Sequence, residues 1–352
     1  MIRRLILSLA CLALALALPG CLDFSPDGTQ IVFPWDDGLA ILRTDGTGMQ
    51  SLPEGGTMPV WSPDGKHILF FQEVDKITNL MLYDTAQKKT TRIGAKYEPP
   101  AVWREDGQRF AALHKTEKGE SEMVWSNLQG VVSLRMTLPF DRVGDLKMVW
   151  LPGTDSLALI GNEEKGNKTN VYTLEEGEVK RVTKTNDVIG LALSGDKKKL
   201  VWARKSPNLA YILLSMYAYD LTARSVAQLP FPDRVPLLNP DPRHAPNEIS
   251  YVAFSPDGNR LALLAKMPAG TDTKTKQKLQ TDACYVLRMD GSEARLIEKT
   301  PPSEEGDGVI APVWSHNGAQ LALLYADEKR QEIKLFSADG KEAKTLKSAM
   351  PH

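Results

Sequence analysis

Cysteine is scarce in this chain of 352 residues: Cys11 and Cys21 lie near the N-terminus, and Cys284 is alone in the remainder. A disulfide framework is therefore excluded, and we expect Cys284, between Ala283 and Tyr285, to be a buried core residue. An excess of one charge is also missing, since 43 Lys and Arg face 44 Asp and Glu. Without a basic excess or a long basic run, nucleic acid is not expected as a partner.

Signatures of catalysis are absent as well. The sequence has no G-x-S-x-G elbow, no H-E-x-x-H, no phosphate-binding loop and no C-x-x-C. A metal centre needs several donors that converge, whereas the histidines are scattered along the chain. Before the C-terminal His352 they are His67, His114, His244 and His316. We therefore predict a chain that is not an enzyme and that holds neither a metal nor a cofactor.

The N-terminus has the pattern of an export signal. Arg3 and Arg4 precede an apolar run over residues 5–18, which is too short for a comfortable membrane span. The run ends in Leu18-Pro19-Gly20-Cys21, which resembles the lipobox of bacterial lipoproteins. The resemblance implies a signal peptide over residues 1–20, cleavage before Cys21 and lipidation of that cysteine. An ordinary secretory signal and an uncleaved anchor are the alternatives.

Leu22, rather than an aspartate, follows the cysteine, which in Gram-negative bacteria resembles the choice for sorting to the outer membrane. We therefore expect the mature chain, residues 21–352, to contact the membrane through lipid on Cys21, at the outer membrane and facing the periplasm. Cleavage would remove Arg3 and Arg4 and leave a net charge of about −3.

A short turn motif recurs along the mature chain. In its clearest copy Phe254 is followed by Ser255, Pro256, Asp257 and Gly258. The proline presets φ, the aspartate suits the next position, and the glycine accepts a positive φ. An apolar run follows, as in a strand buried on both faces. Seven copies, with degenerate turns in the fourth and fifth, are preceded by Phe24, Trp61, Trp103, Trp150, Leu193, Phe254 and Trp314.

The copies are spaced by about 37 to 47 residues, and by about 60 over the last two intervals, close to the period of four-stranded propeller blades. The sequence therefore predicts an all-β fold, a seven-bladed β-propeller of four-stranded antiparallel blades starting near residues 22, 59, 101, 146, 189, 251 and 311. We expect the turn aspartates to cap their own turns rather than bind calcium. The recurrent tryptophans, Trp61, Trp103, Trp150 and Trp314, should pack between blades.

The repeat resembles one known family. An aromatic residue, the Ser-Pro-Asp-Gly turn, an apolar strand and a strand ending in Tyr-Asp, as in Leu82-Tyr83-Asp84 and Tyr219-Asp220, are similar to TolB-type propellers over residues 22–347. The resemblance implies the blade type but no activity, because binding proteins, peptidase domains and lyases share that blade. TolB also has a separate N-terminal domain, whereas here the first blade is expected directly after Cys21.

Three long connections interrupt blades five to seven: Pro230–Asn247, Met267–Asp282 and Lys299–Ile310. If the strands of each blade run outward in order, all three lie on one face of the blades. The first contains six prolines and is expected to be either a contact loop or a decoration without a partner. The second is polar and rich in lysine and threonine, so we expect solvated disorder.

Candidate contact residues lie on this same face. In the proline-rich connection, Arg234, Arg243 and His244 would be the polar contacts with a partner. Trp35 falls in a connection between the second and third strands of the first blade, where it is either exposed for a partner or packed locally.

These observations together predict a membrane-anchored, exported lipoprotein. Its propeller would be a monomeric, non-enzymatic module for protein binding or scaffolding in the cell envelope, with an envelope protein or peptide as partner. The alternative is a propeller enzyme, a lyase or hydrolase with its site in the axial channel. A purely structural envelope protein is the third interpretation.

Overall fold

The computed structural model describes residues 22–35, 38–52, 55–140, 142–163, 168–175, 177–205, 214–232, 248–273, 275–302, 309–326 and 331–348. The chain divides into two compact units, residues 1–186 and 187–352, which are described in turn. Over the described ranges, no helix has the length and apolar character needed to cross a membrane.

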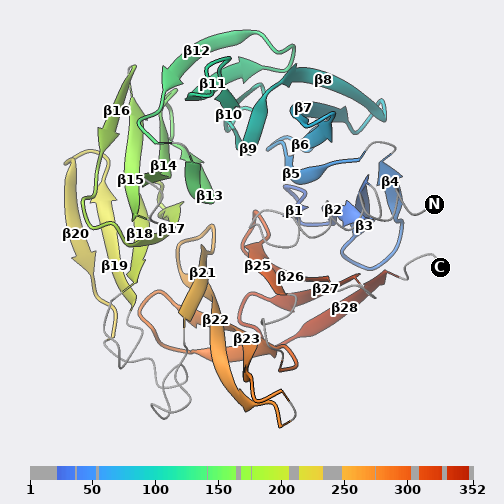
Figure 1. Cartoon of the computed structure of the whole chain (residues 1–352), viewed down its shortest axis with the longest axis vertical. Helices are drawn as coiled ribbons and strands as arrows, with labels where there is room; N and C mark the ends of the chain where they lie inside the picture. The colour runs from blue at the N-terminus through green and yellow to red at the C-terminus, as the bar shows by residue number, and fades with distance from the viewer. Residues whose placement is uncertain are drawn as a thin grey trace. The chain divides into compact units, whose positions relative to one another are not determined.

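Unit 1 contains four antiparallel sheets of four strands each, which we call blades one to four (Figure 1). Neighbouring blades meet through their first strands, as the contacts of β1 with β5, β5 with β9 and β9 with β13 show. The strands are β1 (Asp23–Phe24), β2 (Gln30–Trp35), β3 (Gly38–Arg43) and β4 (Gln50–Leu52); β5 (Thr57–Trp61), β6 (His67–Val74), β7 (Ile77–Asp84) and β8 (Lys89–Ala95); β9 (Tyr97–Trp103), β10 (Arg109–Lys115), β11 (Ser121–Asn127) and β12 (Val132–Thr137); β13 (Arg142–Trp150), β14 (Leu157–Glu163), β15 (Lys168–Glu175) and β16 (Glu178–Arg181).

Unit 2 contains blades five to seven, built in the same way. Their strands are β17 (Val188–Leu193), β18 (Lys199–Lys205), β19 (Leu214–Asp220) and β20 (Ser225–Leu229); β21 (Glu248–Phe254), β22 (Arg260–Thr271), β23 (Lys278–Arg288) and β24 (Arg295–Lys299); β25 (Val309–Trp314), β26 (Gln320–Ala326), β27 (Gln331–Ser337) and β28 (Ala343–Ser348).

Each sheet is built from four strands that follow one another in the sequence and lie in that order in space. No described strand belongs to the sheet of another blade, so the backbone hydrogen bonds of a blade all close within one stretch of chain. The seven four-stranded sheets confirm the predicted all-β, seven-bladed propeller.

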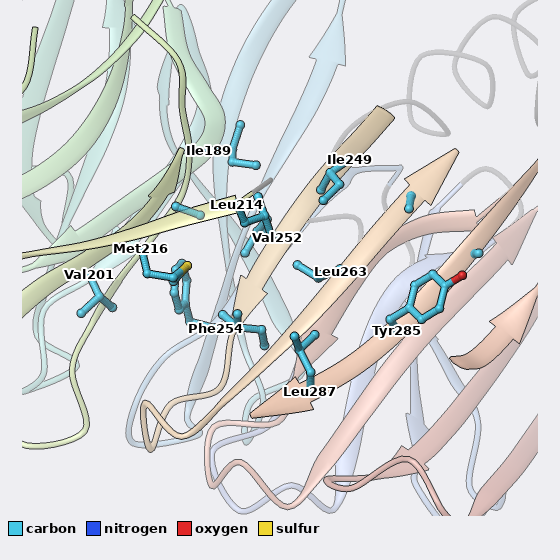
Figure 2. Packing of buried hydrophobic residues seen from close by; sticks show 14 of the residues in the cluster. Ile189, Val201, Leu214, Met216, Ile249, Val252, Phe254, Leu263, Tyr285 and Leu287 are labelled. Atoms are coloured by element: carbon cyan, nitrogen blue, oxygen red, sulfur yellow. The ribbon is translucent and has the colours of Figure 1, made fainter. Parts of the chain in front are cut away.

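Apolar side chains of the first three strands of each blade form the core. In unit 2, Val201 and Met216 of blade five pack with Val252, Phe254 and Leu263 of blade six (Figure 2). Because blade two packs between blades one and three, its strand β6 has four consecutive buried residues, Ile68–Phe71, instead of an alternating pattern. This packing explains the continuous apolar runs that follow each turn motif.

The connection Met267–Asp282 is a β-hairpin over its described residues, so the prediction of solvated disorder was wrong. The strands β22 and β23 continue their pairing through Met267 opposite Thr281, and on to Thr271 opposite Lys278. At the tip, the Asp272 carboxylate accepts a hydrogen bond from the Thr275 N–H at 2.7 Å. The polar composition suggested a loop, but cross-strand backbone pairing needs no apolar side chains.

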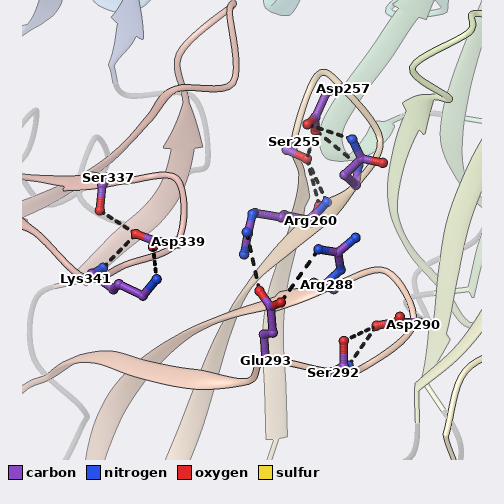
Figure 3. A network of polar contacts seen from close by, with 11 residues as sticks. Ser255, Asp257, Arg260, Arg288, Asp290, Ser292, Glu293, Ser337, Asp339 and Lys341 are labelled. Carbon is purple, nitrogen blue, oxygen red and sulfur yellow. Dashed lines mark hydrogen bonds and ion pairs between the residues drawn. The ribbon is translucent and has the colours of Figure 1, made fainter.

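The turn aspartates cap their own turns, as predicted. In blade six, Ser255 Oγ donates to Asp257 Oδ1, and the Asn259 N–H donates to the same oxygen at 3.1 Å (Figure 3). Ser255 Oγ in turn accepts the Arg260 N–H at 2.9 Å. Blade seven has Asn317 at the aspartate position, where its side-chain oxygen accepts the same kind of bonds. Asparagine is therefore compatible with this turn.

In unit 2 the turns of neighbouring blades pack closely against one another. A Cβ atom built on Gly318 would lie 3.7 Å from Cδ of Pro256 in the preceding blade, an ordinary contact. Between blades five and six the approach is closer: a Cβ atom on Gly258 would lie 2.7 Å from the Gly195 nitrogen, and one on Gly195 would lie 2.1 Å from the Asp257 carbonyl oxygen. The fifth blade has Gly195 where blades one, two and six have proline, and the turn of blade six occupies the space that the missing side chain leaves.

Candidate functional site

Four of the five residues singled out for lipidation or partner contact lie outside the described residues: Cys21, Arg234, Arg243 and His244. The same holds for most of the proline-rich connection, since the structure describes its chain only up to residue 232 and again from residue 248. Their predicted roles therefore stay predictions.

Trp35 is packed rather than exposed. It ends strand β2, opposite Gly38 of β3, and its side chain is only 9% exposed. Its ring lies edge-on to Phe33, with ring centroids 6.2 Å apart. The expectation of an exposed tryptophan was wrong, and the alternative of local packing is confirmed. The β-ladder extends two residues further than the Pro34-Trp35 sequence indicated.

The recurrent tryptophans lie mainly between blades, as predicted. The indole N–H of Trp103 donates to the Val60 carbonyl of the preceding blade at 3.1 Å, and that of Trp314 donates to the Ala253 carbonyl at 3.2 Å. Trp150 instead donates to the Thr154 carbonyl of its own turn.

In unit 1, the described histidines His67 and His114 lie in different blades. His67 lies 3.9 Å from the Asp84 carboxylate and stacks near Trp103, whereas His114 lies 3.6 Å from Glu122 in blade three. Burial lowers the pKa of His114, with Arg135 adding to the effect. Within the described part of the chain, no group of three His, Cys, Asp or Glu side chains is placed to hold a metal ion.

A cavity of about 490 Å³ between blades one and two is the candidate site. It lies at the end of these blades where the first strand turns into the second, which we call the turn end. The opposite end, where β2 and β6 finish, is the tether end. The cavity is lined by Ser25, Pro26, Asp27, Gln30, Ile41, Gln50, Trp61, Pro63, Asp64, Gly65, Tyr83 and Thr85.

Strand register brings these side chains together. The Gln50 side-chain amide of β4 donates to the Tyr83 hydroxyl of β7 at 2.9 Å, which links the two blades across the cavity. The backbone N–H of Trp61 donates to the Asp23 carboxylate at 2.8 Å, a second link between the blades. Burial raises the pKa of Tyr83, so its hydroxyl stays neutral at physiological pH.

The cavity is negatively charged. Hydrogen bonds, first from the Ser25 hydroxyl, hold the pKa of Asp27 below its usual value. Burial acts to raise the pKa of Asp64, but hydrogen bonds from Ser62 and the Lys66 N–H outweigh it, and the net shift is downward. The residues that line the cavity include no lysine, arginine or histidine. The site therefore presents two carboxylates and several neutral polar groups, a set suited to a cationic or hydroxyl-rich ligand.

The sequence did not point to this cavity, because its two carboxylates belong to turns whose aspartates also have a structural role. Gln50 and Tyr83 are far apart in the chain, and only the pairing of blades one and two brings them into contact. The one signal in the sequence for this contact was Gln50, at the start of the fourth strand of blade one, together with Tyr83 near the end of the third strand of blade two.

Comparison with family models found no match for the chain, and comparison with curated proteins found none either. Solved structures do match. The β-propeller domain of the Trilobed protease from Pyrococcus furiosus aligns with a TM-score of 0.60 and 15% identity, over 91% of this chain and 94% of that one. An oligogalacturonate lyase in complex with manganese aligns with a TM-score of 0.60 and 14% identity, over 89% of this chain and 87% of that one.

TolB from Acinetobacter baumannii aligns with a TM-score of 0.47 and 16% identity, over 98% of this chain and 69% of that one. The seven-bladed propeller fold expected from the repeat is confirmed by the blades themselves. At these identities the similarity concerns the fold and not the activity.

Proposed function

We propose that this chain is a lipid-anchored binding module of the cell envelope, without catalytic activity, that binds a basic segment of an envelope protein or peptide at the turn end of blades one and two. The observation behind the binding role is the cavity with its two anionic carboxylates and no cationic side chain in its lining. A lysine or arginine there would pair with Asp27 or Asp64. Both residues are exposed, so each pair would contribute about 0–1 kcal/mol and would be screened by salt.

The anchoring role rests on the leader. Arg3, Arg4, the apolar run and the sequence ending at Cys21 have the order that lipid attachment requires. A triacylated cysteine would hold the chain firmly by itself, since two or more chains give stable anchoring. The outer membrane, facing the periplasm, is the proposed location.

The binding role can be tested by removing charge without disturbing the turns. Asparagine serves as the turn cap in blade seven through Asn317, so Asp27→Asn combined with Asp64→Asn should leave the fold intact. The matched control is Asp257→Asn, which makes the same change in a turn outside the cavity. We expect the double variant to lose a partner recovered by crosslinking from the membrane fraction, and the control to keep it.

The binding should also weaken as salt is raised, because it depends on charge. Equal capture by the double variant and the control would contradict the proposed site. A separate variant that replaces residues 233–247 with a short glycine-serine linker tests the proline-rich connection. Loss of the partner only in this variant would move the site to that connection.

A further inference from the structure

The hairpin of β6 and β7 ends in two exposed apolar side chains. Val74 and Ile77 are 48% and 43% exposed, and they are cross-strand partners. Such partners lie side by side on the same face of a hairpin. Asp75 and Lys76 between them have φ values of 50° and 64°, as in a tight two-residue hairpin turn. The apolar pair is therefore held on a well-defined tip rather than on a long loop.

This tip lies at the tether end of unit 1. Strand β6 runs away from the turn end and finishes at Val74, whereas β1 runs toward the turn end, and its first residue, Asp23, pairs with Val32, the third residue of β2. Blade two is the direct neighbour of blade one, since β1 and β2 both contact β5. Strand β6 has 8 residues and β2 has 6, so this hairpin extends roughly 6–7 Å further than that of blade one.

The tether is short, and this step rests on the proposed lipid anchor. Cys21 is joined directly to Leu22, which is buried with only 2% of its surface exposed. One peptide unit spans about 3.8 Å. Because the chain enters β1 from the direction of the tether end, a lipid on Cys21 would hold the membrane on this side of blade one, and the longer hairpin of blade two extends toward it.

A neighbouring hairpin provides the contrast. The β10–β11 connection of blade three turns at the same end of the blades, and its residues Glu117, Lys118 and Glu120 are charged and exposed. The charged tip of blade three is suited to water, whereas transfer of Val74 and Ile77 at the β6–β7 tip out of water would be favourable in free energy.

We propose that Val74 and Ile77 insert among the phospholipid headgroups beside the anchor and form a second contact with the membrane. Lys76, between them, is placed to meet lipid phosphates. Two points of contact fix the orientation of unit 1, with the tether end on the bilayer and the cavity at the turn end facing the aqueous phase.

The test uses the full lipidated protein reconstituted in vesicles of phosphatidylethanolamine and phosphatidylglycerol. A polarity-sensitive dye is attached to one introduced cysteine at a time: Glu73→Cys beside the tip, Lys118→Cys on the charged tip, or Lys66→Cys at the turn end. Cys284 should not react, because it is 1% exposed and burial raises the pKa of its thiol. Quenching by spin-labelled phospholipid then reports which position touches lipid.

We expect strong quenching at position 73, weak quenching at 118 and none at 66. Adding Val74→Ser and Ile77→Ser to the Glu73→Cys protein should lower the equilibrium constant for insertion of the tip about tenfold, while the protein still floats with the vesicles. Equal quenching at 73 and 66 in floating protein would overturn the second contact and leave the anchor standing. Protein that fails to float with the vesicles would overturn the anchor, and the second contact with it.

Discussion

Blade five departs from the turn motif of the other blades, and we predict that repairing its two positions has opposite effects. Ser194, Gly195 and Asp196 replace Ser-Pro-Asp, and Lys197 replaces the glycine with a φ of 57°. Restoring repeat residues usually stabilises a protein. Here we expect a side chain at position 195, in Gly195→Ala or Gly195→Pro, to destabilise unit 2, and Lys197→Gly to stabilise it.

The magnitudes follow from the contacts. A Cβ atom on Gly195 would lie 2.1 Å from the Asp257 carbonyl oxygen and 2.7 Å from its carbon. The turn of blade six would have to move by about 1 Å, and overpacking of this kind costs about 1–3 kcal/mol. At Lys197 the left-handed backbone costs about 1–2 kcal/mol, and glycine would remove this strain. Glycine also has a larger conformational entropy in the unfolded chain, which offsets roughly half of the gain. The net gain of Lys197→Gly should be about 0.5–1 kcal/mol.

Urea unfolding of residues 22–352, followed by circular dichroism and tryptophan fluorescence, measures these free energies. The control in the same unit is Gly270→Ala, where φ is 98° and no atom lies within 4 Å of the added Cβ. Gly270→Ala therefore measures the cost of placing an alanine at a positive φ where the added Cβ atom meets no other atom. If Gly195→Ala unfolds at the same urea concentration as the unmodified chain, the close contact between the turns of blades five and six is wrong.

Three further predictions concern polar groups. Asn170→Ala should cost about 2–3 kcal/mol in urea unfolding, because Asn170 is fully buried and accepts the Thr183 hydroxyl at 3.1 Å, a partner that would be left unsatisfied. Burial holds the pKa of His114 below 6.5 in the folded chain, so the unfolded chain binds more protons just below that pH, and the free energy of unfolding should fall as the pH drops from 7.5 to 5.5. His114→Gln should make this loss of stability smaller. A pH profile of stability that is unchanged in the variant would refute the prediction. Arg204→Lys should cost about 0.5–1 kcal/mol in thermal unfolding, because lysine cannot reproduce the two bonds of 2.8 Å to Asp187.

The repeat was enough to predict the fold. Pro256, Asp257 and Gly258 specify a turn through local backbone preferences, and an apolar run after the turn requires burial on both faces. Both signals are local in the sequence, and few folds other than a propeller are compatible with their recurrence at the spacing of four-stranded blades. The early parts of the first strands were missed, because a bulge such as that between Thr57 and Val60 breaks the alternation.

The site depended on contacts that a sequence does not display. Trp35 follows Pro34, which suggested a loop, yet β2 and β3 pair as far as Trp35 opposite Gly38. The Gln50 to Tyr83 hydrogen bond joins two blades and follows from their packing alone. Composition also misled in the hairpin around Met267, where backbone pairing outweighs polar side chains.

If the chain is exported as proposed, the order of strands within each sheet has a consequence for how it folds. A secreted polypeptide leaves its translocation pore from one end to the other, and a sheet that recruits a distant strand must wait for that strand to emerge. Here the ladder of every described blade closes within four consecutive strands. Each blade could therefore complete its backbone hydrogen bonds as soon as its own four strands are outside the pore, a stretch that runs from Asp23 to Leu52 in the shortest blade and from Glu248 to Lys299 in the longest. The time during which an unpaired strand edge is exposed to aggregation is correspondingly short.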